Sequence, residues 1–201
     1  MNIFTPADLP RLEPDDWGVF WDIWDKHADW LTKVKKSQLR SAEVGINNVW
    51  KGFDIYKTQM SVDWLAPYHD ISQSLPNMFK LIMSCHPHIY RARFIQSKTA
   101  IMPHTDDNTN KWTIRALLHS PAKQSQWFFT QPVPGAKDKT YITMPQDTNW
   151  FMYNDRYAWH GSDYDENNEK ILLQIYAYST PQDLLNRSLE KYKNYVIEFA
   201  S

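Results

Sequence analysis

Two histidines and one aspartate are the residues most able to do chemistry in this sequence. His104 and Asp106 stand two positions apart at the end of a strand-like segment, and His160 lies 56 residues beyond His104. Side chains two residues apart in a strand point to the same side. Two histidines and one carboxylate can hold one face of an octahedral iron, leaving three positions open for cosubstrate and oxygen. The spacing therefore predicts His104, Asp106 and His160 as the metal ligands and catalytic centre of an oxygen-activating iron enzyme.

Basic residues near these ligands extend the prediction. Such an iron needs electrons to activate oxygen, and a 2-oxo acid that chelates the metal can supply them if a cation holds its far carboxylate. Arg115 lies in a hydrophobic strand-like run, where an unpaired charge would be costly. Lys170 begins a later strand ten residues after His160, although a solvated strand end beside Glu169 fits it equally well. Both Arg115 and Lys170 are candidate cosubstrate anchors.

Candidate substrate contacts come from two other segments. Arg91 and Arg93 alternate with apolar residues, so one strand face carries two cations. Arg93 is central in its segment and is expected to contact the substrate, whereas Arg91 is expected to face outward. Trp127 is a second candidate for the substrate pocket. Most of the 10 Trp, 11 Tyr and 9 Phe residues are expected to build the core.

The elements that must position these residues follow from periodicity and turn signals. Helices are expected from Asp15 to about Lys36, after Pro76, and over residues 181–201, where Thr180 would cap the start. Between the last two, turn residues separate eight short strands: Ile89–Gln96, Thr99–His104, Lys111–His119, Gln126–Thr130, Thr140–Met144, Asn149–Tyr153, Ala158–Gly161 and Lys170–Tyr178.

Eight strands without an intervening helix predict a mainly β fold, a double-sheet jelly roll. The chain of 201 residues is expected to form one domain. A helical N-terminal portion (residues 1–85) and a C-terminal helix (181–201) would pack outside the jelly-roll core (86–180).

Composition narrows the function classes. The net charge of -1 argues against nucleic acid or an anionic membrane as partner. One cysteine excludes an intramolecular disulfide framework, and a structural zinc site needs more cysteines. No secretory signal or membrane-spanning run is recognised, so a cytoplasmic protein is expected. The remaining partner is a small-molecule or peptide substrate.

The His104-Thr105-Asp106, His160 and Lys170 arrangement on eight short strands resembles the Fe(II)/2-oxoglutarate-dependent dioxygenases. The stretch 103–110, followed by Arg115, Leu117 and His119, looks most like their aspartyl/asparaginyl β-hydroxylase branch. The resemblance covers about residues 89–178. It implies a double-stranded β-helix of the cupin-like kind, with Fe(II), 2-oxoglutarate and O2 as cofactor and cosubstrates.

The resemblance also implies a reaction and roles for two cations. An amino acid, free or within a peptide, would be hydroxylated while succinate and CO2 are released. Arg115 and Lys170 map onto the residues that bind 2-oxoglutarate, although the branch usually has arginine where this chain has Lys170. Asp106 occupies the place that a halide takes in related halogenases, which favours hydroxylation.

Two other function classes fit the same sequence. One is a non-catalytic cupin-like protein that binds a metal or a small carboxylate. The other is a cupin dioxygenase that does not use 2-oxoglutarate. Succinate formation and oxygen consumption distinguish these alternatives from the hydroxylase.

Overall fold

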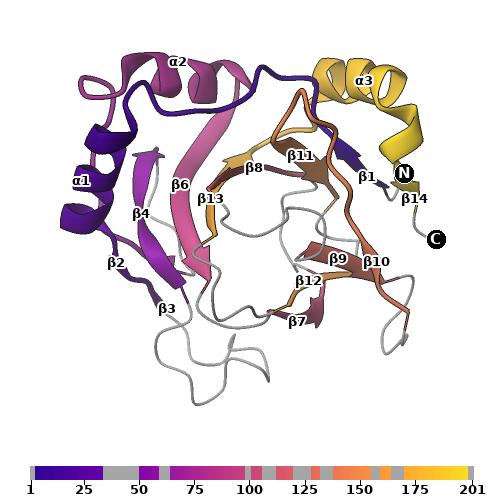
Figure 1. The fold of residues 1–201 in the computed structure, drawn as a ribbon, viewed down its shortest axis with the longest axis horizontal. Coiled ribbons are helices and arrows are strands. Elements are labelled where there is room, and N and C mark those ends of the chain that lie inside the picture. Colours follow the sequence, from indigo (N-terminus) through magenta and orange to yellow (C-terminus); the bar gives the residue numbers. More distant parts are fainter. Residues whose placement is uncertain are drawn as a thin grey trace.

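The structure is a computed structural model, and it describes residues 3–33, 50–58, 64–97, 101–105, 112–119, 128–131, 138–154, 159–163 and 170–198. Two antiparallel sheets dominate these residues, and three α-helices lie on the outer side of the larger sheet (Figure 1). The helices are α1 (Trp17–His27), α2 (Pro76–Ser84) and α3 (Gln182–Lys191), and a 3-10 turn, η3 (Lys193–Tyr195), follows α3.

The large sheet has the strand order β14-β1-β11-β8-β13-β6-β4-β2. Its strands are β1 (Ile3–Pro6), β2 (Asp29–Trp30), β4 (Trp50–Lys57), β6 (Ile89–Ser97), β8 (Thr113–His119), β11 (Trp150–Tyr153), β13 (Ile171–Ala177) and β14 (Ile197–Glu198). The small sheet has the order β10-β9-β12-β7, with β7 (Ile101–His104), β9 (Phe128–Gln131), β10 (Thr140–Tyr141) and β12 (Trp159–Ser162). A separate pair joins β3 (Thr32–Lys33) to β5 (Trp64–Leu65).

The predicted jelly roll is confirmed. All eight predicted segments contain strands, and along the chain they are divided between the sheets: β6, β8, β11 and β13 join the large sheet, whereas β7, β9, β10 and β12 form the small one. Consecutive strands thus alternate between the sheets, except for the β9–β10 hairpin. Because the chain passes repeatedly from one sheet to the other, segments that are far apart in the sequence become neighbours.

The two faces of the large sheet differ in chemistry. Its outer face is apolar and packs against the helices; the ring of Phe94 on β6, for example, meets that of Phe20 on α1 with centroids 5.4 Å apart. Side chains on the opposite face, called the inner face here, alternate with those of the outer face along each strand. It carries a second apolar cluster that includes Ile95, Leu117 and Leu172, together with the polar residues described below.

Helix α1 begins as predicted but ends earlier. Asp16 caps it, because its side chain accepts a hydrogen bond from the Val19 amide at 3.1 Å. The expected continuation toward Lys36 is wrong, since the helix ends at His27 and the chain turns into β2, which pairs with β4. Tertiary pairing with a distant strand therefore overrides the apolar periodicity that continues past His27.

The N-terminal portion, expected to be helical apart from strand-like composition at 49–50 and 53–56, also contributes strands. β1, β2 and β4 belong to the large sheet, and β1 lies between β11 and β14. The predicted helix after Pro76 is confirmed as α2, with Met78 and Ile82 buried. Asp15, expected at the start of α1, instead accepts hydrogen bonds from the amides of Asn77 and Met78 at the start of α2.

The C-terminal helix is shorter than residues 181–201. Pro181 occupies its N-cap and no side chain caps it, so the expected cap by Thr180 is wrong. The helix ends at Lys191, and after η3 the chain returns to the large sheet as β14.

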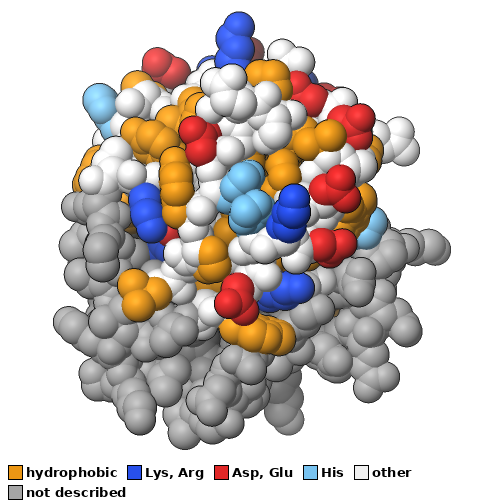
Figure 2. Space-filling model, turned by 90° about the vertical axis from the view of Figure 1, so that its left-hand side faces the viewer, with side chains coloured by type: hydrophobic (Ala, Val, Ile, Leu, Met, Phe, Trp, Pro, Cys, Tyr) orange, Lys and Arg blue, Asp and Glu red, His pale blue; other side chains and the backbone are white. Residues whose placement is uncertain are grey.

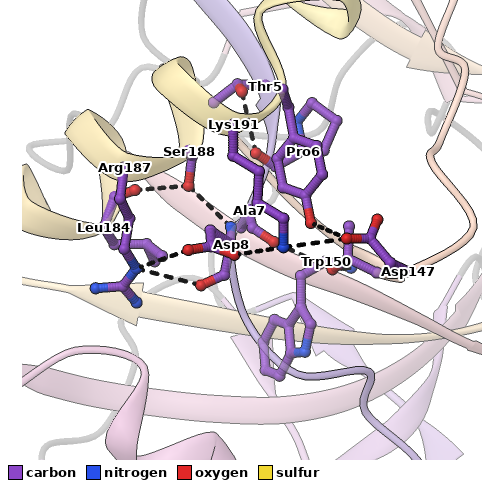
Figure 3. Close-up of polar contacts among 12 residues, drawn as sticks. Thr5, Pro6, Ala7, Asp8, Asp147, Trp150, Leu184, Arg187, Ser188 and Lys191 are labelled. Atoms are coloured by element: carbon purple, nitrogen blue, oxygen red, sulfur yellow. Dashed lines mark hydrogen bonds and ion pairs between the residues drawn. The ribbon is translucent and has the colours of Figure 1, made fainter.

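Polar contacts hold α3 against the N-terminal segment (Figure 3). The Ser188 hydroxyl accepts from the Asp8 amide at 2.9 Å and donates to the Leu184 carbonyl at 2.6 Å. Lys191 Nζ lies 2.7 Å from Asp8 Oδ1 and 3.0 Å from Asp147 Oδ2. These contacts fix the helix outside the sheet, away from the inner face.

The surface beside α1 mixes acidic, basic and hydrophobic side chains around a group of histidines (Figure 2). His27, the last residue of α1, stacks on His69 with ring centroids 3.8 Å apart. Within the described ranges, no helix combines the length and apolar character that crossing a membrane requires.

Candidate metal and anion site

His104 and His160 lie directly opposite each other in the small sheet. They are paired across β7 and β12, and their ring centroids are 4.4 Å apart at an interplanar angle of 55°. Directly opposed residues of an antiparallel pair point to the same side of the sheet. His160 is 1% exposed and His104 is half-buried. The structure therefore brings together two of the three predicted metal ligands.

The third predicted ligand, Asp106, lies outside the described residues, which end at Thr105 in this segment. Its role as a ligand stays a prediction. In the described part of the chain, His, Cys, Asp and Glu side chains form no group of three or more that could hold a metal.

Tyr153 connects the histidine pair to the large sheet. Its buried ring lies 4.7 Å from that of His160, between centroids, and Arg115 Cζ lies 5.2 Å from the centroid of the same tyrosine ring. Both distances are measured to the centroid of the Tyr153 ring, so Arg115 Cζ lies at most about 10 Å from the centroid of the His160 ring. Sequence reasoning did not select Tyr153, although strand alternation in β11 places it with Phe151 on the inner face.

Three inner-face residues form a row across the large sheet. Gln174 on β13 is paired with Arg93 on β6 on one side and with Arg115 on β8 on the other. All three side chains are buried. Adjacent strands are about 4.8 Å apart, so the backbones of the two arginines are roughly 10 Å apart. The two predicted cations therefore flank Gln174 on the same face of the large sheet.

Arg93 is held along one edge of its guanidinium. Nε and Nη2 donate to Gln174 Oε1 at 3.4 and 3.1 Å, and Nη2 also donates to the Tyr176 hydroxyl at 2.5 Å. Arg93 Cζ lies 5.2 Å from the centroid of the Tyr176 ring. The other terminal nitrogen, Nη1, is buried and has no hydrogen-bond partner among the described residues.

Burial lowers the pKa of Arg93, and the neighbouring charges of Arg91 and Arg115 act in the same direction. Tyr176 and Asp54 oppose this shift. The surroundings of this guanidinium therefore disfavour its charge.

Arg91 does not face outward as expected. It is 4% exposed, and its Nε and Nη2 donate to the two carboxylate oxygens of Asp54 at 2.8 and 3.1 Å. Asp54 lies on β4 and is itself 2% exposed. Sequence alternation showed that Arg91 shares a face with Arg93, but only the pairing of β4 with β6 reveals the carboxylate beside it.

Lys170 is half-buried and directly precedes β13. Burial by itself would raise the pKa of Asp163, but hydrogen bonds from Lys139 and Tyr141 and the charge of Lys170 lower it. Lys170 is therefore one of two lysines whose charge acts on Asp163. Its role as a cosubstrate anchor stays a prediction, and Trp127 lies outside the described residues.

Two other histidines have structural contacts. His119 meets the rings of Trp17 and Trp21 on α1, at the end of β8 where the pairing with β13 is irregular. His86 is buried and its Nδ1 accepts a hydrogen bond from the His88 amide at 2.9 Å.

No protein-family model matches the sequence, and neither does any curated protein. Solved structures similar to the chain include a 2OG-Fe(II) oxygenase-family oxidoreductase from Burkholderia pseudomallei, at 12% identity and a TM-score of 0.42, covering 67% of this chain and 70% of that one. A prolyl-4-hydroxylase from Pseudomonas putida is 11% identical with a TM-score of 0.42, over 73% of this chain and 76% of that one.

Another similar structure is the non-heme alpha-ketoglutarate-dependent epimerase SnoN of nogalamycin biosynthesis. It is 10% identical with a TM-score of 0.44, covering 89% of this chain and 79% of that one. At these values the likenesses carry no argument about chemistry, which depends on the side chains described above.

Proposed function

We propose that this chain is an Fe(II)- and 2-oxoglutarate-dependent dioxygenase that hydroxylates an amino acid or an amino-acid side chain. The observation that carries the proposal is the His104–His160 pair, whose rings are opposed across two strands with centroids 4.4 Å apart. Asp106, two residues beyond His104, would complete the ligand set. Two imidazoles and one carboxylate are the donors that non-heme ferrous iron takes in oxygenases.

The chain's own residues would divide the work as follows. His104, Asp106 and His160 would hold the iron, and Tyr153 would fix the orientation of the His160 ring by packing against it. Arg115 or Lys170 would bind the far carboxylate of 2-oxoglutarate, while Arg93 and Trp127 would contact the substrate. When bound, ferrous iron with 2-oxoglutarate and O2 supplies the oxidation that yields succinate, CO2 and a hydroxylated product. The buried inner face would keep bulk water from the reacting groups.

Iron binding and succinate formation test this proposal directly. Purified protein is mixed anaerobically with ferrous iron and 2-oxoglutarate, and the weak visible charge-transfer band is recorded; oxygen is then admitted and succinate is measured. The wild type is expected to give both signals. His160→Ala is expected to weaken iron binding by at least about 100-fold, because removal of a direct ligand should exceed the effect of removing a residue that only supports one.

His119→Ala is the matched control, because His119 contacts α1 instead of the histidine pair. Circular dichroism should show that both variants keep their fold. Normal iron content in His160→Ala would contradict the ligand assignment. Folded wild-type protein that gives neither signal would support the non-catalytic binding protein, and oxygen consumption that ignores 2-oxoglutarate would support a cupin dioxygenase of another kind.

Titration with 2-oxoglutarate, followed by the same charge-transfer band, distinguishes the two candidate anchors. Arg115 is buried and lies close to the tyrosine that packs on His160, whereas Lys170 is half-buried and its charge acts on Asp163. Arg115→Met is therefore expected to raise the dissociation constant of 2-oxoglutarate by about 30-fold or more, which corresponds to a lost charge-assisted bond of roughly 2 kcal/mol. Lys170→Met is expected to have a smaller effect. Equal and negligible effects would remove both residues as anchors.

A further inference from the structure

One terminal nitrogen of the Arg93 guanidinium makes no hydrogen bond to the described residues, and this nitrogen could bind a ligand. Of the three guanidinium nitrogens, Nε and Nη2 contact Gln174 and Tyr176, whereas Nη1 is buried without a hydrogen-bond partner in the described ranges. Arg93 is 7% exposed, so water does not readily reach it. A buried donor that bonds neither to protein nor to water costs roughly 1–3 kcal/mol, and more when it is charged.

The charge of Arg93 is also unmatched by its hydrogen-bond partners. Gln174 and Tyr176 are neutral, and the nearby carboxylate of Asp54 accepts hydrogen bonds from Arg91 with both its oxygens and lies 3.7 Å from Lys57 Nζ. Protein interiors seldom bury arginine without an anion. The fixed edge of the guanidinium leaves Nη1 as the donor that an incoming anion would meet.

The position of Arg93 suits a ligand of the proposed site. Its pairing through Gln174 puts it in one row with Arg115, and Arg115 lies over the ring that packs on His160. An acid bound near the histidine pair could therefore extend across the inner face toward both guanidiniums. Planar carboxylates match the geometry of guanidinium donors.

We propose that Arg93 Nη1 binds a carboxylate of a small-molecule ligand on the inner face, as an anion-binding residue distinct from Arg115 and Lys170. The site is defined by Arg93 and by the two side chains that orient it, Gln174 and Tyr176. The identity of the ligand rests on the proposed function, under which the carboxylate belongs either to 2-oxoglutarate or to an acidic substrate.

Glutarate tests the anion site without iron chemistry, because it has the two carboxylates of 2-oxoglutarate but lacks the keto group. Its binding to iron-free protein is measured by ligand-observed NMR and compared with that of the uncharged diamide, glutaramide. Wild-type protein should bind glutarate and not glutaramide. Arg93→Met should lose at least about 30-fold in glutarate affinity, the ratio expected for one buried charge-assisted contact.

Arg187→Met is the matched control, since it removes a guanidinium that is 48% exposed on α3 and pairs with Asp8. It should bind glutarate as the wild type does. Arg93→Met should also be at least as stable as the wild type without ligand, because it removes an unmatched buried charge. If Arg93→Met does not fold, Arg93→Lys replaces it, and its affinity should still fall below that of Arg187→Met.

The iron-loaded protein distinguishes the two sources of the carboxylate. A rise in the dissociation constant of 2-oxoglutarate in Arg93→Met, read from the charge-transfer band, would assign the cosubstrate. An unchanged constant, with a raised KM for free amino acids and no succinate formation with their amides, would assign the substrate. Absence of every iron-dependent signal would reject the proposed function and leave the glutarate result to decide on Arg93. Glutarate affinities within about twofold for wild type and Arg93→Met, or equal binding of glutaramide, would overturn the proposal.

Discussion

Removing the charge of Asp54 should destabilise the protein strongly, because the guanidinium of Arg91 would stay buried without the carboxylate that it contacts. The two carboxylate oxygens accept hydrogen bonds from Nε and Nη2 at 2.8 and 3.1 Å, and the side chains are 2% and 4% exposed. Asp54→Asn keeps the shape of the side chain but removes its charge. Breaking such a pair from one side costs about 3–5 kcal/mol. That is a large part of the roughly 5–15 kcal/mol by which a domain of this kind is stable.

Urea unfolding followed by tryptophan fluorescence measures this effect. For a slope of roughly 2–3 kcal/mol per molar urea, the midpoint should fall by about 1–2 M. Glu13→Gln is the control, because it removes one charge from an exposed pair in which Arg11 and Glu13 are 40% and 59% exposed. The control should change stability by less than about 1 kcal/mol.

A double substitution separates the loss of the pair from the burial of an unpaired charge. Asp54→Leu combined with Arg91→Met replaces both charges with apolar side chains, and such replacements are often neutral or stabilising. The double variant should therefore be more stable than Asp54→Asn alone. A cost below about 1 kcal/mol for Asp54→Asn, with an unchanged unfolding slope, would refute the reasoning.

Two further changes test the fold and its pH dependence. Gly52→Ala should destabilise the protein by about 3 kcal/mol or more in the same urea assay, because the added Cβ would lie 2.0 Å from the backbone oxygen of Phe94 and push β4 away from β6. The control Gly18→Ala, in α1, should remain within about 1 kcal/mol of the wild type. Equal effects of the two substitutions would contradict the close packing of β4 on β6. Burial lowers the pKa of His86 and of His69 below the ordinary value of 6.5. As the pH falls, the unfolded chain therefore takes up protons before the folded protein does. The free energy of unfolding should decline from about pH 6.5 toward the lowered pKa values, and these groups should change it little above pH 6.5. His86→Asn should reduce that slope in urea titrations at a series of pH values, and an undiminished slope would exclude His86 as its source.

Local patterns in the sequence predicted most of the core. The eight strands were recognisable because alternation and turn residues act over a few positions, and α2 was recognisable from Pro76 and an apolar stripe. The end of α1 was not, because the residues after His27 leave the helix to pair with Lys51 and Gly52, which are distant in the sequence. Asp15 shows the same limit, since its helix-capping contacts are made to α2 and not to the adjacent helix.

The candidate site was likewise predictable from the sequence only in part. The sequence by itself determined which residues could ligate iron or bind an acid, because His, Asp, Arg and Lys are the types able to do so and alternation gives their shared faces. Tertiary structure alone decided that His104 lies opposite His160 and that Tyr153 joins this pair to Arg115. It also decided that Asp54 pairs with Arg91, whereas Arg93 Nη1 has no hydrogen-bond partner in the described part of the chain. Those relations depend on strand register and on which strands become neighbours, and both are set by packing the whole chain.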